Sequence, residues 1–169
     1  ATQYTVDQWY QLIGRGLEME PLVVQQRAAM DAWDPQRRIG LVVDEWGAWY
    51  DVEPGTEPGF LYQQSTLRDA VVAALNFHMF HRHADRVVMA NIAQTVNVLQ
   101  AMILTDKEKM LRTPTYWAFE MFKVHQGGIV LPVDLTSPDY TFGDQHIPAV
   151  SASATRAAGG GSVHLSLVN

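Results

Sequence analysis

The sequence predicts an α/β fold in which a short parallel layer is followed by β structure alone. Helical and short apolar segments alternate along roughly the first three quarters of the 169 residues. The last quarter alternates apolar and polar residues between turn signals, as strands do. Two βα units cannot complete a sheet with covered faces, so the chain is either a small α/β protein or the last part of a barrel that leads into a β-sandwich.

Residues 6 to 33 are predicted to form two helices rather than one. Apolar residues recur there at three- and four-residue intervals, namely Trp9, Leu12, Ile13 and Leu17. Helix-breaking residues interrupt the pattern at Gly14, Gly16 and Pro21. The run IGLVVDEW that follows is short, continuous and rich in Ile and Val, which favours a strand buried on both faces of a parallel sheet.

A loop over residues 50 to 64, with two prolines and two glycines, separates this strand from a second predicted helix. The helix runs from about Thr66 to His81, and Ser65 and Thr66 are both suitable N-caps. Its expected apolar face comprises Leu67, Val71, Ala74, Leu75 and Met79. The run DRVVMANIA then predicts a second short strand.

A third helix and several strands complete the chain. Thr113 is the expected N-cap, Pro114 the first helical residue, and Gly127 and Gly128 the end of this helix. The runs IVLPVDL, AVSASATRA and SVHLSLVN predict three strands, and AAGGGS predicts a tight turn between the last two.

Charge and cysteine content exclude several classes of protein. The net charge of -6, with no basic patch to offset it, argues against nucleic-acid binding. The absence of cysteine removes disulfides, thiolate metal sites and a thiol nucleophile, and it fits a cytoplasmic location. We expect no membrane partner, because no apolar stretch is long enough and no signal segment opens the chain. We also expect both ends to be cuts, since the chain starts without Met and ends within a predicted strand.

Two carboxylates stand at the end of the first predicted strand, in the stretch LVVDEWGAWY. Active sites of α/β barrels lie at the C-terminal ends of the parallel strands, which is where Asp44 and Glu45 stand. Neighbouring strand residues point to opposite faces, so only one of the two should face a barrel interior. The alternative is that the carboxylates cap a turn and that the aromatic residues behind them, Trp46, Trp49 and Tyr50, belong to the core.

The same edge also has the composition of a sugar site. Sugar rings stack their C–H faces on aromatic side chains, and their hydroxyl groups pair with carboxylates and amides. The second predicted strand supplies amides in MANIAQ, at Asn91 and Gln94. Carbohydrate chemistry is therefore the hypothesis that these residues favour.

Longer motifs extend this hypothesis. In order along the chain, DEW, MANIAQTVNVLQ and TPTYWAFEMF resemble the C-terminal half of the catalytic domain of α-L-arabinofuranosidases of glycoside hydrolase family 51. The resemblance covers roughly residues 1 to 140. It implies that residues 1–127 are the last two βα units of a (β/α)8 TIM barrel and that residues 128–169 begin a C-terminal β-sandwich.

The resemblance implies exo-acting removal of terminal α-L-arabinofuranosyl groups from arabinan- and arabinoxylan-type oligosaccharides, with retention of configuration and without cofactor or metal. Glu45 of DEW matches the family's nucleophile, and Trp49 matches an aromatic wall of the sugar subsite. Gln94 matches a Gln that hydrogen-bonds near the nucleophile and the bound arabinose. Asn91 and Trp46 are further candidates for substrate binding.

Retention needs a second carboxyl group, about 5 to 5.5 Å from the nucleophile. The family takes this acid/base Glu from an Asn-Glu pair on barrel strand four, and the present sequence contains no such pair. Glu53 and Glu57 lie in the predicted loop and are poor substitutes. We therefore expect the chain alone to be inactive and to need an N-terminal barrel half, from the same or a second chain.

Two other functions and one further assembly stay open. The chain could be a non-catalytic carbohydrate-binding or interaction module that kept the sugar-facing half, or one half of a split two-chain enzyme. A homo-oligomer is a further candidate assembly, because the exposed edges of a cut parallel sheet can pair with other chains.

A histidine cluster and an aromatic helix complete the candidates. His78, His81 and His83 have a spacing that could share a metal ion, but a helix C-terminus also favours His, and we prefer that interpretation. The aromatic residues of the third helix are expected to pack against the sandwich, namely Tyr116, Trp117, Phe119 and Phe122.

Overall fold

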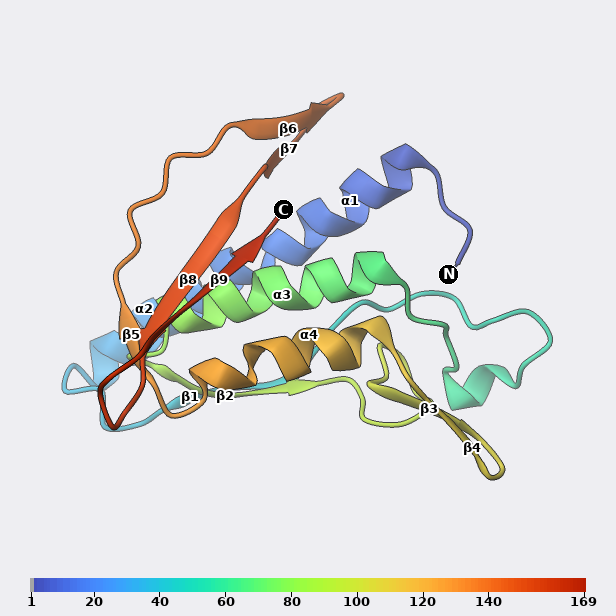
Figure 1. Ribbon diagram of the computed structural model, residues 1–169, viewed down its shortest axis with the longest axis horizontal. Coiled ribbons are helices and arrows are strands. Elements are labelled where there is room, and N and C mark those ends of the chain that lie inside the picture. The colour runs from blue at the N-terminus through green and yellow to red at the C-terminus, as the bar shows by residue number, and fades with distance from the viewer. Residues whose placement is uncertain (1) are drawn as a thin grey trace.

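The computed structural model describes residues 2–169 and opens with two helices, α1 (Val6–Leu17) and α2 (Met19–Trp33). Thr5 caps α1, since its side chain accepts a hydrogen bond from the backbone N–H of Gln8 at 3.2 Å. The single residue between the helices, Glu18, keeps helical backbone angles, so α2 continues α1 closely in space (Figure 1). The prediction of two helices over this segment is confirmed.

The next three elements form one β-α-β unit. Strand β1 (Leu41–Trp46) pairs in parallel with β2 (Val87–Ile92), and helix α3 (Leu67–Arg82) connects them. Asp69 and Thr66 close a capping box at the start of α3, with the backbone N–H of Thr66 2.6 Å from the Asp69 carboxylate. The loop before α3 is irregular apart from one 3-10 turn, η1 (Pro58–Phe60).

One hydrophobic core lies between this strand pair and helices α2, α3 and α4 (Pro114–Phe122). Its buried residues include Trp46, Ala73, Met79, Phe80 and Ala118. Burial of these side chains is the main favourable contribution to the free energy of folding here. The predicted apolar face of α3 holds for Ala74, Leu75 and Met79, whereas Leu67 is 67% exposed because it lies at the first residue of the helix.

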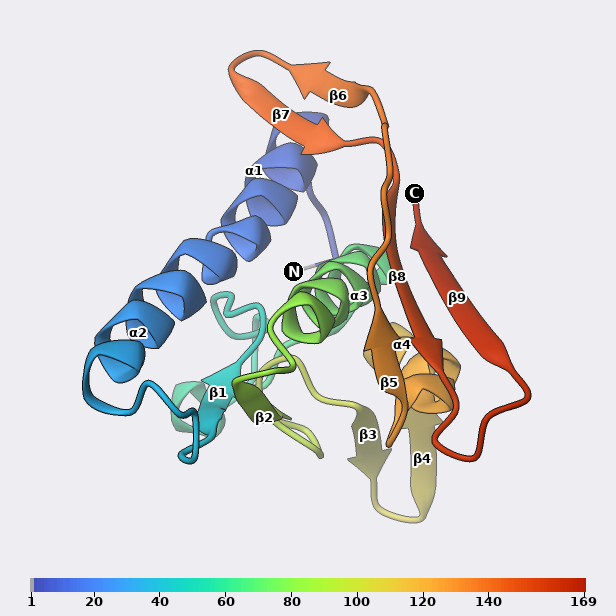
Figure 2. The same ribbon diagram turned by 90° about the vertical axis from the view of Figure 1, so that its left-hand side faces the viewer.

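Helices cover only one face of the β1–β2 pair (Figure 2). Val42 is 43% exposed, Val88 67% and Met89 54%, all in strands that the sequence predicted to be buried on both faces. Within the residues described, that prediction is wrong. The open face is apolar, and no other strand of the described chain pairs with either β1 or β2.

A hairpin that the sequence did not predict follows β2. It consists of β3 (Ile103–Asp106) and β4 (Lys109–Arg112), which pair antiparallel. Helix α4 (Pro114–Phe122) then starts after Thr113, whose hydroxyl accepts from the backbone N–H of Tyr116 at 3.3 Å. The predicted cap and first residue of this helix are confirmed.

The turn η2 (Lys123–His125) and Gly127, which has a φ of +69°, complete the end of α4. Of the aromatic residues on α4, Phe119 packs against Phe77 and Trp46 rather than against the later strands. Trp117 is 48% exposed, so the expected packing of this aromatic set against the sandwich is wrong for both residues.

The remaining strands are antiparallel. Strands β5 (Ile129–Leu131), β8 (Ser151–Arg156) and β9 (Val163–Val168) form one sheet in the order β5-β8-β9, as the three predicted strand runs and the Gly-rich turn require. An unpredicted hairpin, β6 (Asp139–Phe142) and β7 (Gln145–Pro148), connects β5 to β8 and reaches α1.

The fold is therefore a mixed α/β structure with one parallel strand pair and otherwise antiparallel sheets. Within residues 2–169, none of the helices has the length and apolar composition needed to cross a membrane.

Candidate functional site

A β-bulge places Asp44 and Glu45 side by side at the C-terminal edge of the parallel strands. Val43 pairs with Ala90 and Trp46 pairs with Ile92, so two residues of β1 stand opposite the single residue Asn91 of β2. Leu41, Val43 and Trp46 pack toward the helices. The spacing between the last two, three residues instead of two, leaves both carboxylates exposed on the strand pair.

The bulge corrects the expectation that Asp44 and Glu45 point to opposite faces. Strict alternation holds only in a regular strand, and the extra residue shifts the alternation by one position. Asn91 donates a hydrogen bond from Nδ2 to Oδ1 of Asp44 at 3.4 Å, which ties the ends of the two strands together. Within residues 2–169, Glu45 has neither a hydrogen bond nor an ion pair, and its carboxylate is open to a ligand.

Trp46 lies on the other side of the strand pair from these carboxylates. Its side chain is 3% exposed, and its ring packs edge-on against Phe77 and Phe80 at centroid distances of 5.6 and 5.3 Å. A ring that is enclosed by helices α3 and α4 cannot stack on a sugar. Trp46 is therefore a core residue, and the sequence-based assignment to substrate binding is corrected.

Of the two tryptophans Trp46 and Trp49, Trp49 is the exposed one. Its side chain is 64% exposed and lines a shallow pocket of about 290 Å³ together with Leu12, Arg15 and Glu18 of the N-terminal helices. Gln94 lines a different pocket, so the described residues do not bring Trp49 and Gln94 into one cavity.

Two buried glutamines hold the segment that carries Trp49. Gln100 accepts a hydrogen bond from the backbone N–H of Ala48 at 2.6 Å, and Gln63 donates to the carbonyl of Ala48 at 2.9 Å. Gln63 also accepts from the backbone N–H of Tyr50 at 2.8 Å. Both glutamines are fully buried, so these bonds fix the backbone on either side of Trp49.

The sequence analysis missed these two positioning residues. Gln100 continues a run of amides at three-residue steps that starts at Asn91, and this run is the signal that could have indicated a polar role. Gln63 carries no such signal. Gly47 is a third constraint, because its φ is +137° and a Cβ added at this position would lie only 3.2 Å from the Gln100 side chain.

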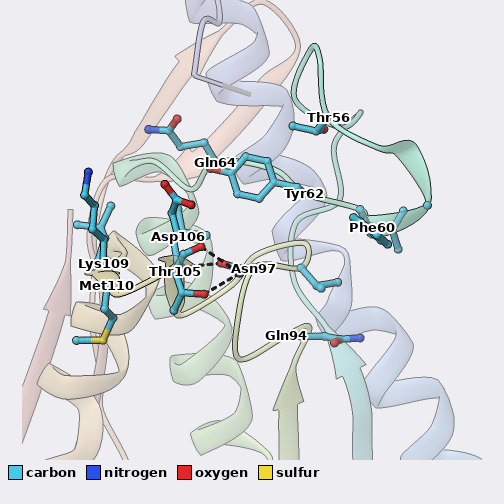
Figure 3. A pocket seen from close by; sticks show the side chains of 15 residues that line it. Thr56, Phe60, Tyr62, Gln64, Gln94, Asn97, Thr105, Asp106, Lys109 and Met110 are labelled. Atoms are coloured by element: carbon cyan, nitrogen blue, oxygen red, sulfur yellow. Dashed lines mark hydrogen bonds between the residues drawn. The ribbon is translucent and has the colours of Figure 1, made fainter.

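Gln94 lies two residues beyond the end of β2 and is exposed. It lines a pocket of about 990 Å³ between the loop after β1 and the β3–β4 hairpin (Figure 3). The backbone of Gln94 is held on both sides, since its N–H donates to the carbonyl of Val98 at 3.1 Å and its carbonyl accepts from Met102 at 3.3 Å.

The two loop glutamates act as local caps. Glu53 accepts a hydrogen bond from the backbone N–H of Gln64 at 3.1 Å, and Glu57 accepts one from the backbone N–H of Gly59 at 3.4 Å. Each carboxylate thus helps to hold the shape of its own loop.

Two members of the histidine cluster, His78 and His81, fasten helix α3 to the antiparallel sheet, whereas His83 bonds to Glu20 of α2 at 3.0 Å. His78 shares hydrogen bonds with the hydroxyls of Ser151 at 2.8 Å and Ser166 at 2.9 Å, and His81 with that of Ser153 at 2.6 Å. No group of three or more metal-ligating side chains lies together in residues 2–169. Burial, followed by the nearby His81, Arg82 and His125 charges, lowers the pKa of His78 to about 4.

The edge thus carries an exposed carboxylate pair with the amide of Asn91 beside it, at the end of parallel strands where α/β barrels have their active sites. Residues 44–165 match the family model of the alpha-L-arabinofuranosidase C-terminal domain. The chain belongs to this family, and the resemblance to glycoside hydrolase family 51 is confirmed.

Known relatives are much longer than this chain. The chain is 49% identical over 170 residues to the intracellular exo-alpha-L-arabinofuranosidase of Bacteroides ovatus, and the match covers 100% of this chain and 33% of that protein. The crystal structure of the GH51 arabinofuranosidase from Xanthomonas axonopodis pv. citri matches with a TM-score of 0.95 and 52% identity, over 98% of this chain and 34% of that one.

The alpha-L-arabinofuranosidase of Thermotoga maritima, solved as an arabinose complex, matches with a TM-score of 0.71 and 25% identity. That match covers 100% of this chain and 36% of the other. The chain therefore spans about one third of the length of these relatives.

Proposed function

We propose that this chain is the C-terminal portion of an exo-acting, retaining α-L-arabinofuranosidase and that Glu45 is its nucleophile. One observation carries the proposal: Glu45 is an exposed carboxylate without a hydrogen-bond partner in residues 2–169, at the C-terminal end of a parallel strand. Active sites of α/β barrels use this position. Family membership adds support from independent evidence.

The proposal includes a barrel that extends outside these residues. Strands β1 and β2 would be its last two strands, within residues 1–127, and the β5-β8-β9 sheet would begin a β-sandwich, within residues 128–169. The exposed apolar face of β1 and β2 supports this arrangement, because Val42 and Met89 would be buried inside a closed barrel. The missing part would come from the same chain or from a second one.

Glu45 would attack the anomeric carbon of the terminal arabinofuranosyl group and form a covalent glycosyl intermediate. A second carboxyl group would protonate the departing oxygen and then activate water. We place this group in the N-terminal barrel half, because the family takes it from an Asn-Glu pair on barrel strand four and the present sequence contains no such pair. Asp44, bonded to Asn91, would keep the strand end in place beside the nucleophile.

We infer the substrate contacts from the family resemblance. Trp49 would form one wall of the sugar subsite, and Gln94 and Asn91 would supply amide groups to the sugar hydroxyls or to the nucleophile. Oligosaccharides of the arabinan and arabinoxylan type would be the substrates. Support comes from the names of the relatives, one of which is an exo-acting arabinofuranosidase and another an arabinose complex.

Replacing Glu45 by Ala in the complete enzyme tests the assignment. We expect the turnover of nitrophenyl α-L-arabinofuranoside to fall by at least about 1,000-fold, with the thermal unfolding midpoint unchanged. Glu108→Ala, which removes an exposed carboxylate from the β3–β4 turn, is the matched control. Near-normal turnover by the Glu45→Ala enzyme would reject the proposal.

The isolated 169-residue chain should not hydrolyse this substrate, because it supplies one of the two carboxyl groups. Hydrolysis by the purified chain would contradict this. Gel filtration with mass identification of any co-purifying polypeptide would distinguish a split enzyme from a single longer chain. Weak arabinose binding without turnover in the complete protein would instead favour a carbohydrate-binding module.

A further inference from the structure

The pocket that Gln94 lines has, apart from Gln94 itself, no role in the chemistry proposed above. One wall is the loop of residues 56–64, which follows β1, and the other is the β3–β4 hairpin, which follows β2 (Figure 3). Both walls therefore extend from the strand edge that carries Asp44 and Glu45. Its volume, about 990 Å³, is at the upper end of the range for small-molecule pockets and exceeds what a single pentose fills.

Hydrogen bonds hold both walls of the pocket in place. The backbone N–H of Leu99 donates to the carbonyl of Leu61 at 2.9 Å and joins the loop to the segment after β2. On the hairpin side, Asn97 accepts from the backbone N–H of Thr105 at 2.7 Å and donates to the Thr105 hydroxyl at 2.9 Å. Because the walls are fixed before a ligand arrives, binding would cost little conformational entropy.

The lining combines exposed aromatic rings with uncharged polar groups. Phe60 is 73% exposed, and the ring of Tyr62 also lines the pocket, so two aromatic faces are available for stacking. Gln64 and Gln94 add amide groups. Exposed aromatic faces are apolar, and their removal from water lowers the free energy. The C–H face of a sugar can cover these rings, while the hydroxyl groups of the sugar bond to the amides.

The charge of the lining points to a neutral ligand. Its charged members are one carboxylate, Asp106, and one ammonium, Lys109, both on the β3–β4 hairpin. The two charges balance, so the pocket favours neither an anion nor a cation. Carboxylate and ammonium groups are both strong hydrogen-bonding partners for neutral hydroxyl groups.

Gln94 connects this pocket to the proposed catalytic edge, because it lines the pocket and lies two residues beyond the end of β2. We propose that the pocket binds the leaving-group side of the substrate, that is, the pentose chain from which the terminal arabinofuranosyl group is removed. This inference rests on the proposed function and adds to it the residues that select the oligosaccharide.

The test compares long and short substrates in the complete enzyme. For each variant, kcat/KM is measured with nitrophenyl α-L-arabinofuranoside, with an α-1,5-linked arabino-oligosaccharide and with an arabinose-substituted xylo-oligosaccharide. The quantity compared is the ratio of each oligosaccharide value to the nitrophenyl value. This ratio does not depend on the fraction of folded enzyme, so partial misfolding of a variant cannot imitate the effect.

We expect Phe60→Ala and Lys109→Met each to lower the ratio by about tenfold for at least one oligosaccharide. The oligosaccharide whose ratio falls identifies the pentose chain that the pocket accepts. Trp117→Ala, which removes an exposed aromatic ring from α4 outside the pocket, is the control and should leave both ratios as they are.

Ratios within twofold of the parent enzyme for both variants and both oligosaccharides would overturn the inference. This is also the result expected if another protein segment fills the pocket. Failure of the proposed function has a different signature. In that case the parent enzyme would not hydrolyse the nitrophenyl substrate, or Glu45→Ala would keep its rate.

Discussion

Two polar regions of the molecule differ in how their polar groups are satisfied. At the C-terminal edge of β1 and β2, Glu45 is exposed and has no partner within residues 2–169. Where α3 meets the β8–β9 pair, His78 uses both ring nitrogens on serine hydroxyls, and its side chain is fully buried. The first region leaves a carboxylate exposed, and the second uses its polar groups to fix the position of the sheet on helix α3.

The difference shows that residue type alone does not indicate function here. Histidine is a common catalytic and metal-binding residue, yet in this chain the histidines of α3 are structural. The proposed chemistry instead lies with a carboxylate that the fold leaves unpaired. Neighbouring residues can even belong to opposite regions, as Glu45 and Trp46 do.

The largest expected effect on stability tests the boundary between the buried core and the open edge of the strands. The test compares two tryptophans that are three residues apart. Trp46→Ala should lower the free energy of unfolding of the complete protein by about 3 to 5 kcal/mol, because it empties a packed site against Phe77 and Phe80. Trp49→Ala should cost less than about 1 kcal/mol, because that ring is 64% exposed.

Denaturant unfolding followed by circular dichroism measures both values. Trp49→Ala should in addition lower kcat/KM on the nitrophenyl substrate, if Trp49 forms a wall of the sugar subsite. Equal stability losses for the two variants would mean that the boundary between the core and the open edge is misplaced.

The sequence predicted most elements because their signals are local. Hydrophobic periodicity and the caps at Thr66 and Thr113 located α3 and α4, and the apolar runs located β1 and β2. The β3–β4 hairpin was not predicted, because its turn has Lys107 at a φ of +55° where a glycine would have signalled a turn. The β6–β7 hairpin did carry a signal, the Gly143-Asp144 pair between two short alternating runs.

The site was predictable only in part, for a physical reason. The bulge at Asp44 and Glu45 depends on how residues 43–46 pair with residues 90–92, far apart in sequence. Burial of Trp46 likewise depends on helices that follow it in the chain. Strand-end position and residue type were enough to select the pair Asp44 and Glu45, and the family resemblance singled out Glu45. The directions of the side chains required the pairing.

The second prediction concerns the buried amide that holds the segment carrying Trp49. Gln100→Leu removes the acceptor for the backbone N–H of Ala48 and the donor to the carbonyl of Asp69. We expect a loss of about 2 kcal/mol in the free energy of unfolding, since a buried N–H is left without a partner. Gln94→Leu is the control, because Gln94 is exposed. A larger loss for Gln94→Leu than for Gln100→Leu would contradict the assignment of Gln100 as a positioning residue.

The third prediction uses pH to weaken the histidine region alone. Burial, reinforced by the nearby His125, lowers the pKa of His81 to about 4. Burial likewise lowers the pKa of His78 to about 4. The unfolded chain, with a His pKa of about 6.5, then binds more protons than the folded one between these values. Stability from these groups is present above pH 6.5 and is lost as the pH falls toward 4.

We expect each of the two histidines to account for about 1 to 2 kcal/mol of this loss, because water at the rim of the interface screens part of the effect. His81→Asn, which keeps a hydrogen-bonding group but does not titrate, should flatten the dependence of unfolding free energy on pH. The exposed His146 on β7 provides the control variant, His146→Asn. An unchanged slope in His81→Asn would contradict the contribution assigned to His81.

The smallest expected effect isolates one bond of the interface. Ser153→Ala removes the hydroxyl that lies 2.6 Å from Nδ1 of His81, and it should lower the free energy of unfolding by about 0.5 to 1.5 kcal/mol. Ser162→Ala, in the exposed turn before β9, should stay within about 0.5 kcal/mol of the parent. A double-mutant cycle with His81→Ala measures the coupling directly, and a coupling near zero would mean that the His81–Ser153 bond does not help to hold the helix on the sheet.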